Sequence, residues 1–124
     1  MILFLTEEGV LKLGTYGLTT QAECYSIKET ECDGVRSFAP EVFEGEYEAK
    51  SDVWSLGIAL LEMMGMTPYS KFANVVFPEM IKEGQLPFDE GAIESEVLLD
   101  FLKKCFLKKE ERWSASELMN VSVM

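Results

Sequence analysis

The side chains most suited to chemistry are hydroxyls concentrated between residues 14 and 40. This stretch has no sustained hydrophobic period, and glycines and Pro40 interrupt it. Connections of this length without secondary structure tend to be functional or disordered. The stretch therefore predicts either a mobile regulatory segment or a plain solvated loop. In the first case a hydroxyl could accept a phosphate, and the candidate phosphorylation sites are Thr19, Thr20, Ser26 and Thr30.

Other reactive side chains are scarce. The sequence has no histidine, which removes the commonest general base and the commonest zinc ligand. Its three cysteines, Cys24, Cys32 and Cys105, are odd in number and lack the paired spacing of metal ligands. This pattern is typical of reduced thiols in the cytosol, so we expect a cytoplasmic protein with no metal site of its own.

An excess of acidic side chains limits the possible partners. The chain has 22 Asp and Glu against 11 Lys and Arg, which gives a net charge of −11. Binding to nucleic acid requires clustered Lys and Arg, and an anionic membrane surface also attracts basic segments. We therefore expect no nucleic-acid partner and no membrane partner, and we interpret the charge as a solubility feature.

These side chains must be positioned by a fold, and the strongest structural signal runs from Ser51 to Met66. The residues are apolar on nearly every side, which is typical of a helix in the middle of a protein. Ser51 is suited to cap the helix, Asp52 follows in the first turn, and Gly65 marks the end. The pattern predicts a buried central helix over residues 51–66.

Weaker patterns surround this helix. Two short apolar runs predict a β-hairpin over residues 2–13, which we expect to lie against the helices because a lone hairpin is barely stable. Ser114 and Glu117 have the spacing of a capping box. The sequence therefore predicts a single, mainly α domain with one small hairpin. Further helices are expected at about 74–83 (or from Pro78 onward, because proline disfavours helix before it), 95–107 and 114–121.

In order along the chain, these elements and their motifs resemble the C-terminal lobe (C-lobe) of a eukaryotic protein kinase. Val10–Leu18 is similar to the strand that leads into the family's Asp-Phe-Gly motif, and Ala39–Glu41 matches its Ala-Pro-Glu motif. Ser51–Gly57 matches the start of the family's central helix, and Cys105–Arg112 is similar to the stretch around its late arginine. The resemblance covers nearly all of residues 1–124, places the activation segment at 14–41, and is nearest to the Ser/Thr kinases of MAP-kinase cascades.

The resemblance implies structural roles for four residues. In the family, the glutamate of Ala-Pro-Glu pairs with the late arginine, so Glu41 and Arg112 are expected to form a buried ion pair rather than to be two unrelated surface charges. Trp54 is the tryptophan of the matching central-helix motif. The family's aspartate at the position of Asp52 accepts backbone amides of the catalytic loop. Without that loop, Asp52 must be exposed, protonated or matched by a partner segment.

Catalytic parts of the family are missing from the sequence. Phosphoryl transfer needs a loop over the phosphates, a Lys–Glu pair, Mg²⁺ ligands and an Asp near the attacking hydroxyl. The chain begins after the positions of most of these parts, and Thr15 replaces the metal-binding Asp, although Gly17 matches the glycine of that motif. We therefore expect no catalytic, cofactor-binding or metal-binding residue in this chain, whereas ATP and Mg²⁺ are implied for the parent family.

Two functional hypotheses follow. One is a C-lobe fragment of a Ser/Thr protein kinase-like protein that is inactive as this chain, and the alternative is a pseudokinase-type protein-binding scaffold in a signalling pathway. A third, an unrelated acidic helical domain, stands outside the resemblance.

The family packs its central helix against a preceding helix that is missing here, so we expect an exposed apolar face. That face favours self-association or a protein partner, including the missing kinase N-lobe and catalytic-loop region. Its expected members are some of Val53, Leu56, Leu60, Met63 and Met64.

Overall fold

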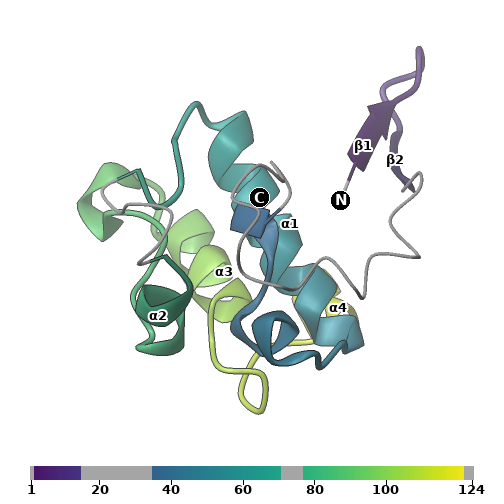
Figure 1. The fold of residues 1–124 in the computed structure, drawn as a ribbon. Coiled ribbons are helices and arrows are strands. Elements are labelled where there is room, and N and C mark those ends of the chain that lie inside the picture. Colours follow the sequence, from purple (N-terminus) through teal and green to yellow (C-terminus); the bar gives the residue numbers. More distant parts are fainter. Residues whose placement is uncertain (1, 15–34, 71–76, 122–124) are drawn as a thin grey trace.

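A computed structural model of the chain describes residues 2–14, 35–70 and 77–121. Within these ranges the chain is mainly helical and has one small two-stranded antiparallel sheet, as the sequence predicts (Figure 1). Most of the predicted activation segment, including Thr15, Gly17 and the four candidate phosphorylation sites, lies outside the described residues. No helix within the described ranges combines the length and the apolar character needed to cross a lipid bilayer.

The central helix, α1, spans Ala49–Met63, and it therefore starts and ends slightly before the predicted range of 51–66. Its N-cap is Glu48, whose backbone is extended, so the prediction that Ser51 caps the helix is wrong. Ser51 instead lies inside the first turn, where its hydroxyl accepts a hydrogen bond from the Glu48 amide at 3.3 Å. After the helix, Gly65 adopts a left-handed φ of 78°, which glycine tolerates without steric cost.

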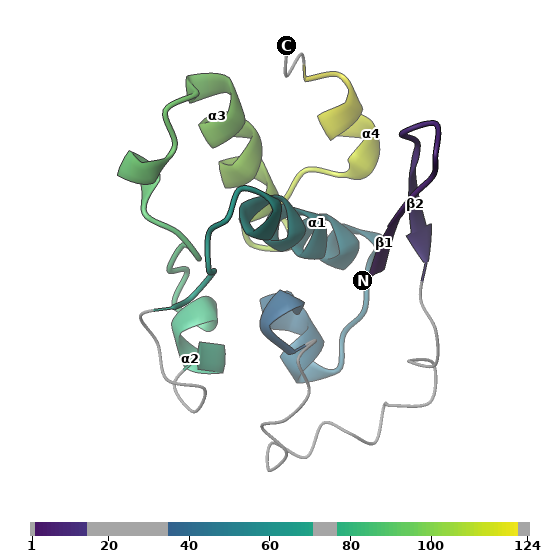
Figure 2. The same cartoon turned by 90° about the horizontal axis from the view of Figure 1, so that it is seen from above.

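Helix α1 lies between two layers of shorter elements (Figure 2). On one side are α3 (Glu96–Cys105) and α4 (Ala115–Met119), and on the other are α2 (Phe77–Lys82) and the 3₁₀ turn η3 (Pro40–Glu44). Because the core forms around α1 on both sides, its buried residues come from every layer. They are Ala39, Val42, Val53, Trp54, Ile58, Leu61, Tyr69, Ile81, Ile93, Leu102, Cys105, Phe106 and Leu118.

A glycine in the middle of α1 allows the close crossing with the C-terminal end of α3. A Cβ atom built at Gly57 would lie 2.7 Å from Cζ of Phe106 and 3.0 Å from Cβ of Cys105. Real Cβ atoms essentially never approach another heavy atom as closely as 2.7 Å. Glycine normally weakens a helix interior by about 0.5–1 kcal/mol relative to alanine, so its use at residue 57 reflects tertiary packing.

Helices α3 and α4 are shorter than the ranges expected from the sequence, and α2 overlaps its expected range. Helix α2 begins at Phe77 with Pro78 in its first turn, where the missing amide proton is not needed, and residues 74–76 lie outside the described residues. The hydroxyl of Ser95 caps α3 by accepting from the Leu98 amide at 3.3 Å. The predicted capping box of α4 is present: Ser114 Oγ accepts from the Glu117 amide, and the Glu117 carboxylate accepts from the Ser114 amide.

The hairpin consists of β1 (Ile2–Leu5) and β2 (Leu11–Gly14), paired antiparallel with Phe4 opposite Lys12. It stands to one side of the helices in Figure 1. Our expectation that it packs against the helices is not met at its tip, because the apolar side chains described there are exposed. Local bonds hold its turn instead, since Thr6 accepts from the Gly9 and Val10 amides. The exposed side chains are Phe4, Leu5, Val10 and Leu11, with exposed fractions of 44–71%.

Candidate functional site

The most buried ion pair in the described residues joins two segments far apart in the sequence. Glu41 lies in η3, and Arg112 lies in the loop between α3 and α4. Nη1 of Arg112 lies 2.5 Å from Oε1 of Glu41, and Nη2 lies 3.1 Å from Oε2. This is a bidentate pair, in which the planar guanidinium matches both carboxylate oxygens. Both residues are buried, so the pair expected from the kinase resemblance lies inside the protein.

Two further N–H groups of the arginine are also used. Nε of Arg112 donates to the Leu107 carbonyl at 3.0 Å, and Nη1 donates to the Lys50 carbonyl at 3.0 Å. On the other side of the pair, the hydroxyl of Ser51 donates to Oε1 of Glu41 at 2.7 Å. The network therefore ties together η3, the first turn of α1 and the loop that follows α3.

Ser51 is the member of this network that our sequence reasoning assigned incorrectly. Its hydroxyl donates to Glu41 and accepts from the Glu48 amide, so Ser51 takes part in a capping box as the third residue of the helix and is not its N-cap. The signal that could have revealed this is helical periodicity, because residues 51, 54, 58 and 61 share the buried face of α1. A hydroxyl on that face needs a partner inside the protein.

Two opposing effects set the pKa of Glu41. Burial acts to raise the pKa, because it disfavours the charged form, but hydrogen bonds from Arg112 and Ser51 outweigh it. The net result is a pKa below the ordinary value of 4.5. Glu41 is therefore ionised at neutral pH, and the buried charges of Glu41 and Arg112 compensate each other.

Trp54 lies beside this network and links it to the core. Its ring is 5.1 Å from the guanidinium carbon of Arg112 and meets Phe106 edge-on, with ring centroids 5.0 Å apart. The indole is 2% exposed, and its Nε1–H is a buried donor with no hydrogen-bond partner among the described residues. Leaving such a donor unpaired costs on the order of 1–3 kcal/mol, so the aromatic and cation–π contacts of Trp54 must offset that cost.

Asp52 follows Ser51 directly but does not join the network. Its side chain is exposed, and it forms no ion pair among the described residues. The sequence left open whether Asp52 is exposed, protonated or matched by a partner segment, and in the structure it is exposed. The structure therefore brings together Glu41, Arg112 and Trp54, and it leaves Asp52 at the surface of the first turn of α1.

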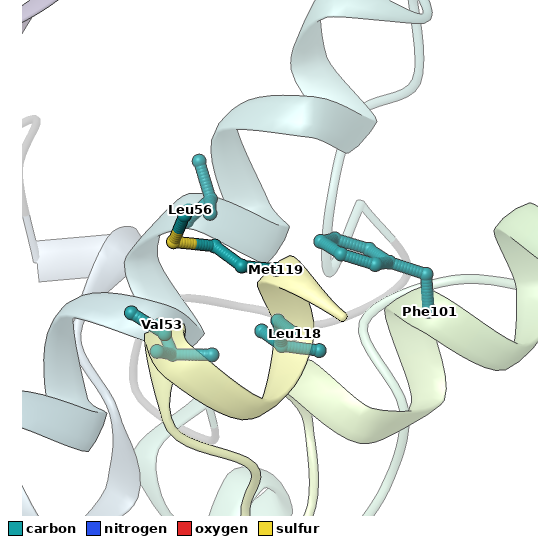
Figure 3. A pocket seen from close by; sticks show the side chains of 6 residues that line it. Val53, Leu56, Phe101, Leu118 and Met119 are labelled. Carbon is teal, nitrogen blue, oxygen red and sulfur yellow. The ribbon is translucent and has the colours of Figure 1, made fainter. Parts of the chain in front are cut away.

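A second feature lies on the side of α1 that faces α3 and α4. There the helices leave an apolar groove with a volume of about 240 Å³ (Figure 3). Leu56 and Phe101 are half-buried in it, while Met119 at its rim is 85% exposed. Figure 3 shows the side chain of Met119 extending toward Leu56. The groove is lined by Val53, Leu56, Phe101, Ala115, Leu118 and Met119.

The five residues expected on an exposed face of the central helix fall into three groups. Met63 and Met64 are exposed, by 66% and 44%, at the C-terminal end of α1. Leu56 and Leu60 are half-buried, and Val53 is buried. The exposed apolar surface of α1 is therefore concentrated toward its C-terminal end and at the groove.

In the described part of the chain, these features provide a structural framework rather than a set of reacting groups. No cluster of three or more His, Cys, Asp or Glu in the described ranges could hold a metal ion. The thiol of Cys105 is buried, and burial raises its pKa to about 12, so it is a poor nucleophile at neutral pH.

Comparison with known proteins agrees with the motifs. A family model for protein tyrosine and serine/threonine kinases matches residues 2–121. The serine/threonine-protein kinase dst1 of Dictyostelium discoideum is 35% identical over 95% of this chain, which spans 17% of that protein. Mitogen-activated protein kinase kinase kinase 17 of Arabidopsis thaliana is 32% identical over 94% of the chain, which spans 33% of it. The serine/threonine-protein kinase hippo of Drosophila melanogaster is 34% identical over 94% of the chain, which spans 18% of it. The chain therefore corresponds to a minor part of each relative.

Proposed function

The chain belongs to the protein tyrosine and serine/threonine kinase family, as a C-lobe fragment of the Ser/Thr type, and we propose that this chain does not itself transfer phosphate. In this proposal it keeps the structural framework of the family without the chemical groups that act on ATP. The parent family uses ATP and Mg²⁺, and whether this chain binds either of them is the first matter to test.

The observation that carries the proposal is the residue at the metal-binding position. Thr15 stands where the family's Asp-Phe-Gly motif has its aspartate. Mg²⁺ is a hard cation that prefers charged oxygen ligands, and a threonine hydroxyl is neutral. The 124 residues also contain no histidine, so the His-Arg-Asp motif of a kinase catalytic loop does not occur in them. Thr15 does not fit the Mg²⁺ ion that the family uses with ATP, and no catalytic step is assigned to these residues.

The alternative that we carry forward is a pseudokinase-type scaffold, which binds a protein partner in a signalling pathway. The exposure of Met63 and Met64 favours it, because apolar side chains at the end of a central helix are available for contact. The partner would be another protein or a kinase N-lobe and catalytic-loop region supplied from outside these residues. The cysteine pattern supports a cytoplasmic location for either role.

The loss of phosphoryl transfer is tested by isothermal titration with ATP, in the presence of Mg²⁺ and again with EDTA. We expect no Mg²⁺-dependent binding to the wild-type chain. The matched variant Thr15→Asp restores a carboxylate at the metal-binding position. A Mg²⁺-dependent heat of ATP binding that appears only in this variant would show that the carboxylate at residue 15 is the missing Mg²⁺ ligand. Mg²⁺-dependent ATP binding by the wild-type chain, or transfer of labelled phosphate to a generic Ser/Thr peptide that Thr15→Ala abolishes, would overturn the proposal.

A further inference from the structure

We propose that two exposed ion pairs, Glu44–Lys82 and Glu46–Lys109, form an electrostatic latch that holds the end of η3 against α2 and against the loop after α3. Added salt opens this latch before the domain unfolds. The latch goes beyond the proposed function, because it governs the movement of one short segment and requires neither ATP nor a protein partner.

A tight turn at the end of η3 places the two glutamates. Gly45, which lies between them, has a left-handed φ of 82° that glycine adopts without steric cost. On one side of it, Oε1 of Glu44 lies 3.1 Å from Nζ of Lys82 at the C-terminal end of α2, which lies beside η3 (Figure 2). On the other side, the carboxylate of Glu46 binds the ammonium group of Lys109 in the loop between α3 and α4. One short turn is thereby tied to two different elements.

The turn is also coupled to the buried ion pair. The amide of Glu46 donates to the carbonyl of Glu41 at 3.1 Å, and Lys109 lies three residues before Arg112. The pairs Glu46–Lys109 and Glu41–Arg112 therefore join the same two segments, the first at the surface and the second inside the protein. Opening the inner pair would leave buried charges without partners, which is strongly unfavourable. The outer pairs are therefore the first part of this assembly to open.

A cavity beside the latch reduces the apolar packing on this side of η3. It has a volume of about 200 Å³ and lies between η3, α2 and residues 106–110. Three members of the latch, Glu44, Lys82 and Lys109, line it together with Trp54 and Phe106. Side chains that border a cavity lose dispersion contacts on that side. The ion pairs therefore supply a larger share of the attraction that holds the turn in place.

Salt distinguishes the latch from the core. The side chains of Lys82 and Glu44 are 43% and 57% exposed, and those of Lys109 and Glu46 are 31% and 51% exposed. The attraction between exposed charges is screened beyond about 10 Å in 0.1 M salt and beyond about 3 Å in 1 M salt, whereas a buried pair is screened much less. The hydrogen bond with Glu46 raises the pKa of Lys109 above its ordinary value of 10.5, so this pair stays charged at neutral pH.

The test is native-state hydrogen exchange of the 124-residue chain, followed by NMR at the backbone amides of Gly45 and Glu46. Both amides donate within the turn, to Val42 and Glu41, so they exchange when the turn opens. We expect them to exchange several-fold faster in about 1 M NaCl than in about 0.02 M NaCl at the same neutral pH. The amides of core residues in the middle of α1 should not become faster.

Matched variants assign the effect to the latch. Lys82→Met and Lys109→Met each remove one pair and should speed exchange of the two turn amides by about two- to fivefold at low salt. The double variant should also lose the salt dependence, and Lys109→Arg, which keeps the charge, should behave as the wild type. The control is Lys103→Met, which removes the comparably exposed pair Lys103–Glu90 elsewhere in the domain and should change these rates by less than about twofold.

Three outcomes would overturn the proposal. Equal exchange at low and high salt would remove the electrostatic part, and equal effects of Lys109→Met and Lys103→Met would remove the location. If the turn amides and the α1 core amides accelerate together in every variant, the turn opens only with the whole domain and there is no separate latch. None of these results depends on nucleotide, so failure of the latch is distinguishable from failure of the proposed function.

Discussion

The two sides of α1 carry similar apolar residues, but one side (the packed side) is buried and the other (the open side) is partly exposed. On one side Trp54, Ile58 and Leu61 are at most 2% exposed, and Ser51 is bonded to a buried ion pair. On the other side Leu56 is half-buried beside the apolar groove, and Met63 at the helix end is 66% exposed. The first side is packed against other described residues. The second presents apolar surface that those residues do not cover, which is why we look for a partner there.

The largest effect is expected where the packed side holds its buried charges. Replacing Arg112 with methionine keeps much of its volume but leaves the Glu41 carboxylate buried without its partner. Breaking a buried pair from one side costs about 3–5 kcal/mol. Urea unfolding of Arg112→Met should therefore show a large drop in the free energy of unfolding.

The double variant Glu41→Leu with Arg112→Met is the control for that loss. Exchanging a buried ion pair for apolar residues is often neutral or stabilising, so the double variant should be more stable than Arg112→Met alone. If the single variant loses less than about 1 kcal/mol, the pair behaves as an exposed one in solution and the packed side is less well closed than its geometry indicates.

A pair of leucine truncations compares the two sides directly. Leu61 is 0% exposed, and removing a fully buried leucine side chain costs about 2–5 kcal/mol. Leu56 is half-buried at the groove, where water already reaches part of the side chain, so Leu56→Ala should cost less. Thermal and urea unfolding of both variants measure the difference. Equal losses would mean that the groove is covered in solution.

Much of the local helical structure could be predicted from the sequence. The period of α3 and the capping box of α4 depend on local spacing, so the patterns at Ser95 and at Ser114 with Glu117 are found where expected. The contact between Glu41 and Arg112 could not come from local spacing, because 71 residues separate the partners. It came from motif resemblance alone.

The errors arose where tertiary contacts override a local preference. Ser51 has the composition of an N-cap, but it lies at the third position of the helix, where its hydroxyl donates to the Glu41 carboxylate and accepts from the Glu48 amide. The hairpin was expected against the helices because apolar residues usually seek cover, yet Leu5 and Val10 remain exposed. The groove was anticipated only as a face of α1, since its other walls come from residues 101–119 and depend on how α3 and α4 pack.

A substitution at Gly57 should show how tightly the crossing of α1 with the end of α3 is filled. Gly57→Ala raises helix propensity by about 0.5–1 kcal/mol, but its methyl would meet Phe106 at 2.7 Å. Overpacking of this kind costs about 1–3 kcal/mol, so we expect a net loss of stability. Adding Phe106→Leu removes the nearest atom and should recover part of that loss. A stabilised Gly57→Ala would show that the crossing can open.

The ion pair also predicts how stability changes in acid. The pKa of Glu41 is lowered in the folded protein, so its contribution is fully present above the unfolded value of 4.5 and is lost as pH falls through the lower folded value. The wild type should therefore lose stability relative to Glu41→Gln as the pH falls below about 4.5, where the advantage of the charged form disappears. Urea midpoints measured from pH 7 down to pH 3 would check this, and a constant difference would contradict it.

The smallest effect is expected on the open side. Met63 is 66% exposed, and a substitution at such a position usually changes stability by no more than about 0.5 kcal/mol. Met63→Lys should therefore unfold at nearly the wild-type urea concentration, in contrast to Leu61→Ala two residues earlier on the same helix. Because lysine is a good helix former, propensity does not confuse the result. If Met63→Lys is as destabilising as Leu61→Ala, then Met63 is covered in solution. The two sides of α1 would then be equally buried, and no apolar surface would be left at this end of the helix for a protein partner.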